Sequence, residues 1–164
     1  MIQKNVDGTG LNRTWEEYIT GFGDYNSDYW IGNKVLSLVT ANISYSLNIV
    51  LESLNMNSRI YHAKYKTFKV LPEAEYYKLQ VDGYSGDANE DMLKKHDNAK
   101  FSTYDQDNDG AKRTHCAEYF GGGWWYSRCG FTYLNVKQDS SGFFKWRNLP
   151  GGDTLKSSEM WLEC

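Results

Sequence analysis

The residues with the clearest chemical potential form one short acidic run, Asp105-Gln106-Asp107-Asn108-Asp109-Gly110. Three carboxylates at alternating positions repel one another unless a cation lies among them, and oxygen ligands at this density suit Ca2+. The run fits the first half of an EF-hand loop, but Cys116 stands where that loop requires a bidentate glutamate. We therefore expect a calcium loop of another kind, with a solvated acidic turn as the alternative.

The cysteines are the second group of residues with chemical potential, as a disulfide or as free thiols. Cys116 and Cys129 bracket a short segment that contains three glycines and two tryptophans, and Cys164 ends the chain. A disulfide between the first two would contribute roughly 3 kcal/mol. Two buried free thiols are the alternative, and spacing alone does not decide between them. Cys164 is either free or available to another chain.

Composition excludes several classes of function. The chain has 164 residues, which predicts one domain. Its net charge is −3, and nothing in the composition forces the basic face that a nucleic-acid-binding protein usually shows, so we expect no nucleic-acid partner. No apolar run is long enough to cross a bilayer. His115 adjoins Cys116, but sequence adjacency is not a catalytic pair, and nucleophile-elbow, zinc-protease and phosphate-loop motifs are absent. We expect no enzyme.

The elements that must position these residues follow from hydrophobic spacing and capping signals. Helices are predicted from Trp15 to the glycines at 21–23, capped by Thr14, and over 34–40, capped by Asn33 with Val35, Leu36, Leu38 and Val39 on its apolar side. A polar helix is predicted over 86–97, with Met92 and Leu93 inward. Strands are predicted over 45–51, 59–70, 75–81 and 155–162. The fold class is α+β: a twisted, mainly antiparallel sheet, short helices and a long loop-rich C-terminal region.

Several motifs, in order along nearly the whole chain, carry a family resemblance. They are Trp15-Glu16-Glu17-Tyr18, Gly21-Phe22-Gly23, Tyr29-Trp30-Ile31-Gly32-Asn33, Gly83-Tyr84-Ser85-Gly86-Asp87-Ala88, the segment 101–109, Cys116-Ala117, Gly123-Trp124-Trp125-Tyr126, Cys129, Leu134-Asn135 and Ser157-Ser158-Glu159-Met160. Together they resemble the fibrinogen C-terminal domain of ficolins, tachylectins, tenascins and angiopoietins. The resemblance implies one domain over 1–164, lacking the family's N-terminal subdomain. Its helix and sheet core would span about 1–82 and 155–162, and its calcium-loop and pocket region about 83–154.

The resemblance also implies a set of site residues. Asp107 and Asp109 would hold Ca2+ together with the backbone carbonyls of Ala111 and Arg113, and Cys116 would be bridged to Cys129. The Arg128–Cys129 peptide bond would be cis and would turn backbone N–H groups toward a pocket for an acetyl group. That pocket would be formed by Phe120, Tyr126, Arg128, Cys129 and Gly130, whereas Trp124 and Trp125 are expected in the core.

The chain departs from the lectin pattern around this pocket. The loop over 136–142 is short, and the tyrosine usual on it is either replaced by Asp139 or lost. Gly130 stands where lectins often carry histidine. We expect an extracellular, calcium-stabilised, lectin-like module that binds glycans or acetylated groups. The alternative is a protein- or receptor-binding module of the angiopoietin and tenascin kind. Oligomers would form through a region outside this chain.

Overall fold

A computed structural model describes residues 1–55 and 57–164. The strands are β1 (Gln3–Asn5), β2 (Phe22–Gly23), β3 (Tyr29–Trp30), β4 (Tyr45–Ser53), β5 (Ile60–Val70), β6 (Leu79–Gly86), β7 (Thr132–Tyr133), β8 (Lys145–Trp146) and β9 (Leu155–Glu163). The helices are α1 (Trp15–Thr20), α2 (Asn33–Thr40) and α3 (Cys116–Phe120), with 3-10 turns η1 (Glu73–Glu75), η2 (Leu93–His96) and η3 (Pro150–Gly152). Among the described residues, no helix is long and apolar enough to span a membrane.

One seven-stranded antiparallel sheet, in the order β2-β3-β1-β9-β4-β5-β6, forms the body of the molecule. Its long strands alternate buried and exposed side chains, as period-two patterning requires, so Leu47, Ile49 and Leu51 of β4 all enter the core. The predicted return of the C-terminal strand is confirmed. β9 lies between β1 and β4, with Met160 opposite Ile49. The α+β expectation is confirmed.

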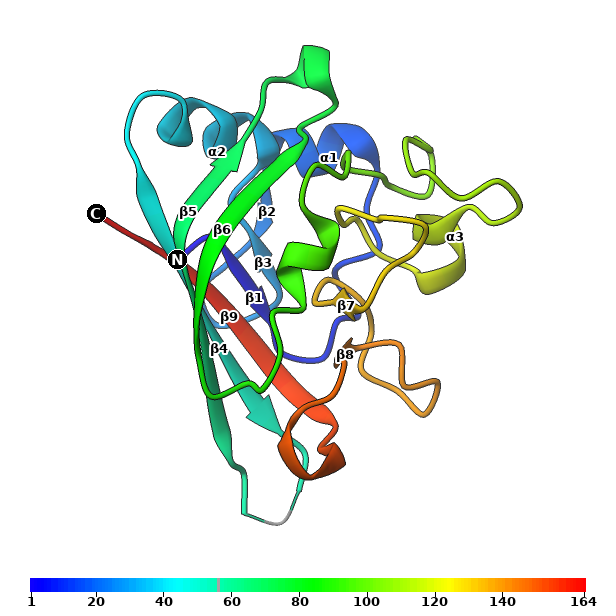
Figure 1. Ribbon diagram of the computed structural model, residues 1–164. Coiled ribbons are helices and arrows are strands. Elements are labelled where there is room, and N and C mark those ends of the chain that lie inside the picture. Colours follow the sequence, from blue (N-terminus) through cyan, green and yellow to red (C-terminus); the bar gives the residue numbers. More distant parts are fainter. Residues whose placement is uncertain (56) are drawn as a thin grey trace.

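The loop-rich segment between β6 and β9 packs to one side of this sheet, beside α1 (Figure 1). Its core is aromatic. Trp125 is fully buried, and its ring centroid lies 5.3 Å from that of Phe101, 5.8 Å from Trp30 and 6.1 Å from Phe68. Trp124 is also fully buried, so the prediction that both tryptophans belong to the core is confirmed. These contacts attach the loops to the sheet.

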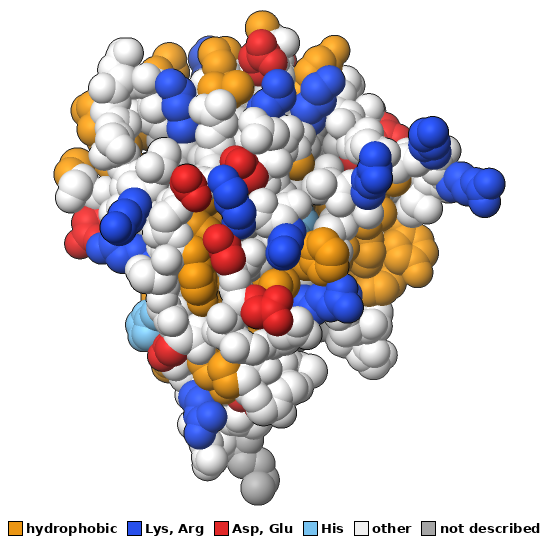
Figure 2. All heavy atoms as spheres, in the orientation of Figure 1, with side chains coloured by type: hydrophobic (Ala, Val, Ile, Leu, Met, Phe, Trp, Pro, Cys, Tyr) orange, Lys and Arg blue, Asp and Glu red, His pale blue; other side chains and the backbone are white. Residues whose placement is uncertain are grey.

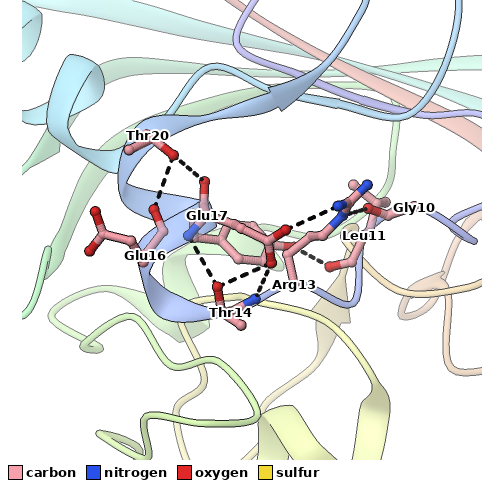
Figure 3. A network of polar contacts seen from close by, with 8 residues as sticks. Gly10, Leu11, Arg13, Thr14, Glu16, Glu17 and Thr20 are labelled. Carbon is pink, nitrogen blue, oxygen red and sulfur yellow. Dashed lines mark hydrogen bonds and ion pairs between the residues drawn. The ribbon is translucent and has the colours of Figure 1, made fainter.

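Helix α1 begins where the sequence predicts it. Thr14 and Glu17 form a capping box, in which the Thr14 hydroxyl accepts from the Glu17 amide and the Glu17 carboxylate accepts from the Thr14 amide (Figure 3). Tyr18 on the same helix donates its hydroxyl proton to the Leu11 carbonyl at 2.6 Å. The cap thus sets the direction in which α1 enters the fold.

Loss of this cap should have a measurable but modest cost. We expect Thr14→Ala to lower the free energy of unfolding by about 1 kcal/mol, because one helical N–H loses its partner. Urea denaturation followed by circular dichroism measures the change. Thr9→Ala, in the exposed loop before α1, is the control and should change the free energy by less than about 0.5 kcal/mol. Equal effects of the two variants would contradict the capping role.

Helix α2 differs from its prediction. Its N-cap is Gly32, and Asn33 is the first helical residue, where its side-chain oxygen accepts from the Trp30 indole. Leu36 is buried as predicted, whereas Val35 and Leu38 are exposed, by 38% and 67%. The other buried positions are polar, Ser37 and Thr40 among them. The reason is that only one narrow stripe along the helix contacts the sheet. Apolar residues on either side of that stripe remain exposed at the surface.

Two further predictions are wrong in their limits. The strand predicted over 75–81 starts only at Leu79, because Tyr76 and Tyr77 adopt left-handed backbone conformations that no strand accommodates. The helix predicted over 86–97 is reduced to η2, although Met92 and Leu93 point inward as expected. The short elements β1, β7, β8 and α3 were not among the predicted elements. Their strands are two or three residues long and depend on pairing with distant segments.

Candidate functional site

The acidic run folds into a loop in which the three aspartates have different hydrogen-bond partners. The Asp105 carboxylate faces α1, where it accepts the backbone N–H of Trp15 at 2.9 Å and the Thr103 hydroxyl at 2.7 Å. It therefore stabilises the positive end of a helix. Asp107 and Asp109 are left as the two carboxylates of a candidate metal site, as the resemblance implies. Within residues 1–55 and 57–164, no group of three His, Cys, Asp or Glu side chains could hold a metal ion.

Asp109 is the organising residue of the loop. One carboxylate oxygen accepts the backbone N–H of Ala111 at 2.7 Å, and the other accepts that of Cys116 at 2.9 Å. Asp107 accepts the backbone N–H of Asp109 at 3.2 Å, and its carboxylate is near enough for its charge to act on that of Asp109. Burial raises the pKa of Asp109, and the charge of Asp107 raises it further, while the two N–H donors lower it. A cation between the carboxylates would remove this repulsion.

Backbone oxygens complete the donor set that calcium prefers. Ala111 and Arg113 follow Asp109 within four residues, and neither carbonyl accepts a hydrogen bond from any described part of the chain. Two carboxylates and two available carbonyls fit a hard oxygen-binding cation. The donor chemistry of the loop is therefore compatible with Ca2+ held by Asp107, Asp109, Ala111 and Arg113.

A disulfide joins Cys116, the first residue of α3, to Cys129, with 5.3 Å between their Cα atoms. The bridge is confirmed, and the free-thiol alternative is excluded for this pair. Because Asp109 accepts from the Cys116 amide, the bridge links the acidic loop directly to the segment that contains Arg128. Cys164 is free and exposed.

Removing the bridge should destabilise the protein without abolishing the sheet. We expect the Cys116→Ser/Cys129→Ser double variant to lose about 3 kcal/mol of unfolding free energy, because a closed loop of this length restricts the unfolded chain by that amount. Thermal and urea unfolding measure the loss. Cys164→Ser is the matched control and should behave like the parent, so an equal loss in that variant would contradict the assignment.

The expected cis bond before Cys129 is absent. Every peptide bond in the described residues is trans, and the chain reverses instead through three successive left-handed residues: Arg128 (φ 48°), Cys129 (φ 68°) and Gly130 (φ 92°). Positive φ at a non-glycine residue is uncommon, and two in succession persist only where surrounding structure holds them. Here the disulfide holds Cys129. The positive φ angles of these three residues thus reverse the chain direction without a cis peptide bond.

Gly130 lies against a buried histidine and not against open space. A Cβ atom at Gly130 would come within 2.2 Å of the His96 ring. His96 is fully buried, and its Nδ1 lies 2.8 Å from the Trp125 carbonyl, while Nε2 accepts the backbone N–H groups of Phe131 and Thr132 at 3.0 and 3.1 Å. Two N–H donors on Nε2 place the ring proton on Nδ1. His96 therefore fixes the segment behind the predicted pocket.

The predicted ligand-binding residues do not surround one cavity. Tyr126 and Arg128 line a hollow of about 330 Å³ together with Asp109. Phe120 lies instead in a stack of rings: its centroid is 4.2 Å from that of Tyr133, 4.8 Å from Phe143 and 6.0 Å from Tyr126. The protein's own aromatic side chains thus occupy the space around Phe120.

Sequence reasoning missed His96, Tyr119, Tyr133 and Phe143 as parts of this region. Tyr119 is 60% exposed, packs against Phe120 and Phe143, and extends the aromatic cluster to the surface. Figure 2 shows hydrophobic side chains gathered beside Lys and Arg side chains on the side where Figure 1 draws α3. The position of Tyr119 next to Phe120 was the available signal. No local pattern predicts the contacts of Phe143, 23 residues from Phe120 along the chain.

The fold and the disulfide-closed loop region define a fibrinogen-like globe. The family model for the C-terminal globular domain of fibrinogen beta and gamma chains matches residues 1–161, and the chain belongs to this family. The globe of human ANGPTL6 superposes with a TM-score of 0.88 at 31% identity, covering 99% of this chain and 76% of that one. Lamprey fibrin D-dimer, solved with the peptide Gly-His-Arg-Pro-amide, gives 0.84 at 30% identity, covering 98% and 59%.

Curated relatives point the same way. Human fibrinogen-like protein 1 is 38% identical over 149 residues, which cover 82% of this chain and 47% of that protein. Fibrinogen-like protein A of Apostichopus parvimensis is 37% identical over 170 residues, covering 99% and 59%. Human angiopoietin-4 is 37% identical over 136 residues, covering 82% and 26%. The chain thus spans 47%, 59% and 26% of the length of these three relatives.

Proposed function

We propose that this chain is an extracellular recognition module that binds a protein partner. The binding surface, here called the aromatic–basic face, consists of Lys112, Arg113, Tyr119, Phe120, Arg128 and Phe143. The observation that carries the proposal is the packing of Phe120, a predicted pocket residue, against other rings of the protein: it stacks on Tyr133 and Tyr126 and meets Phe143 edge to face. Exposed aromatic and arginine side chains are typical anchors of protein interfaces. Similarity to angiopoietin-4 and to ANGPTL globes supports the same class of partner.

Binding by the purified chain to an array of cell-surface protein ectodomains tests this function. We expect saturable binding that free N-acetylglucosamine does not compete and that Tyr119→Ala weakens. Tyr25→Ala is the matched control, because Tyr25 is 64% exposed and packs on Tyr29 of β3 in the sheet. Retention on an N-acetylglucosamine resin, reversed by EDTA and without ectodomain binding, would instead favour glycans or acetylated groups.

We further propose that Ca2+ supports this face structurally. Bound at a hundred times its dissociation constant, the ion should raise the free energy of unfolding by about 2.7 kcal/mol. Asp107→Asn and Asp109→Asn should each remove this increment, measured as thermal unfolding in calcium and in EDTA. Without calcium, Asp107→Asn should be slightly stabilising, since it removes the charge that helps raise the pKa of Asp109.

Asp105→Asn is the control for this experiment. Its carboxylate serves α1 and Thr103, so the variant should lose some stability in both buffers but keep the calcium increment. A parent protein whose unfolding is the same in calcium and in EDTA would contradict the calcium site.

A further inference from the structure

A second hollow adjoins the one that contains Asp109 and shares Gly110 and Arg128 with it. It measures about 460 Å³ and is lined by Gly110, Ala111, Lys112, Arg113, Thr114 and Arg128. Three of these six residues are cations, and none is a carboxylate. The whole chain, by contrast, carries a net charge of −3. The positive charge is therefore a local property of this hollow.

Arg128 is the best-placed of the three cations. Its side chain packs beside Gly110, where an added Cβ would lie 3.7 Å from the Arg128 Cγ, and it lines both this hollow and the one that contains Asp109. Its left-handed backbone is followed by the disulfide-bonded Cys129. The fixed backbone places the start of the Arg128 side chain, and its planar guanidinium is already shaped to meet a carboxylate.

None of the three cations is neutralised within the protein. Across residues 1–55 and 57–164, Lys112, Arg113 and Arg128 form no ion pair. All three are exposed. The hollow thus offers three unpaired positive charges.

We propose that this hollow binds an acidic segment of the protein partner, with a carboxylate on Arg128 and further acidic side chains on Lys112 and Arg113. The inference rests on the proposed function and names the chemistry of its partner. Arginine pairs with carboxylates in a forked, bidentate geometry, so Arg128 would make the specific contact. The charges of Lys112 and Arg113 would attract the acidic segment over a longer range. A cationic peptide such as Gly-His-Arg-Pro-amide, the ligand of the lamprey fibrin neighbour, would be repelled here.

Calcium in the neighbouring loop should strengthen this contact. The carboxylates of Asp107 and Asp109 oppose the field of Arg128, and a divalent cation would neutralise them. Anion binding and calcium binding are then positively coupled, so each raises the affinity of the other by the same factor.

Fluorescence anisotropy with a labelled Glu-rich peptide that contains one tyrosine tests the proposal, using the disulfide-bonded chain in calcium. We expect the Gln-for-Glu version and Gly-His-Arg-Pro-amide to bind at least roughly tenfold more weakly. Arg128→Gln should weaken binding of the acidic peptide roughly tenfold, and Lys112→Gln/Arg113→Gln roughly threefold. Lys66→Gln, on the exposed side of β5, is the matched control and should leave binding unchanged.

The possible results separate this proposal from the function on which it rests. Equal binding of the Gln peptide, or an Arg128→Gln variant that is folded and binds normally, would overturn it. Tight binding of a heparin oligosaccharide with no binding of the peptide would overturn it as well. If an ectodomain binds the chain and Arg128→Gln leaves that binding intact, the inference fails while the protein-binding function stands. If no ectodomain binds but the acidic peptide does, the hollow's preference for acidic peptides stands while the protein-binding function fails.

Discussion

Replacing Trp125 with alanine should lower the free energy of unfolding by about 3–5 kcal/mol, the range for deletion of a large buried aromatic side chain. The ring is fully buried among Trp30, Phe68 and Phe101, so its removal leaves a cavity between the sheet and the loop segment. The indole N–H also donates to the Tyr77 carbonyl at 2.8 Å, and that acceptor would lose its partner. Urea denaturation followed by circular dichroism measures the loss.

Two variants calibrate this result. Trp125→Phe keeps most of the ring volume but loses the hydrogen bond to Tyr77, so it should cost less than the alanine variant. Trp161→Ala removes the same side chain from the surface, where 41% of Trp161 is exposed, and should cost much less. Similar losses at positions 125 and 161 would mean that Trp125 does not join the loops to the sheet.

Replacing His96 with alanine should cost about 4 kcal/mol. Three buried backbone groups, the Trp125 carbonyl and the Phe131 and Thr132 amides, would lose their partner at once, at about 1–3 kcal/mol each when no water replaces it. His62→Ala is the matched control, because His62 is exposed on β5 and should change stability little. A small effect at position 96 would contradict its role in fixing the 125–132 segment.

His96 also makes stability depend on pH. Burial lowers the pKa of His96 from 6.5 to about 4. Between these values the unfolded chain binds the proton more readily than the folded one, so this contribution to stability is complete above about pH 6.5 and is lost as the pH falls toward 4. Urea midpoints at pH 7, 6 and 5 should therefore fall more steeply for the parent and for His62→Ala than for His96→Ala.

Much of the sheet is predictable because its signals are local. The alternation of Leu47, Ile49 and Leu51 defines β4 within one window, and Thr14 with Glu17 marks the start of α1. Where a prediction failed, the cause lies far along the chain. Tyr77 adopts a left-handed conformation next to a carbonyl that receives the indole N–H of Trp125, 48 residues away. The residues next to Tyr77 in the sequence do not include Trp125, so local pattern cannot predict that contact.

The candidate site divides in the same way. Spacing drew attention to the acidic run and to the two nearby cysteines, and the family resemblance then singled out Asp107, Asp109 and the Cys116–Cys129 pair. The resemblance leaves Asp105 out of the ligand set, and the tertiary structure supplies the physical reason: its carboxylate accepts the backbone N–H of Trp15 in α1. Local pattern identifies candidates here, and tertiary contacts select among them.

By itself the sequence determined the family, the sheet-forming segments, the acidic loop and the cysteine pair, since each depends on residues close together or on motifs kept in order. Only the tertiary structure decided that Phe120 is stacked among Tyr126, Tyr133 and Phe143, and that Arg128 stands between two hollows. The physical reason is that ring stacking and charge clustering depend on distances between segments. Those distances are set when the loops pack against the sheet through Trp125 and His96.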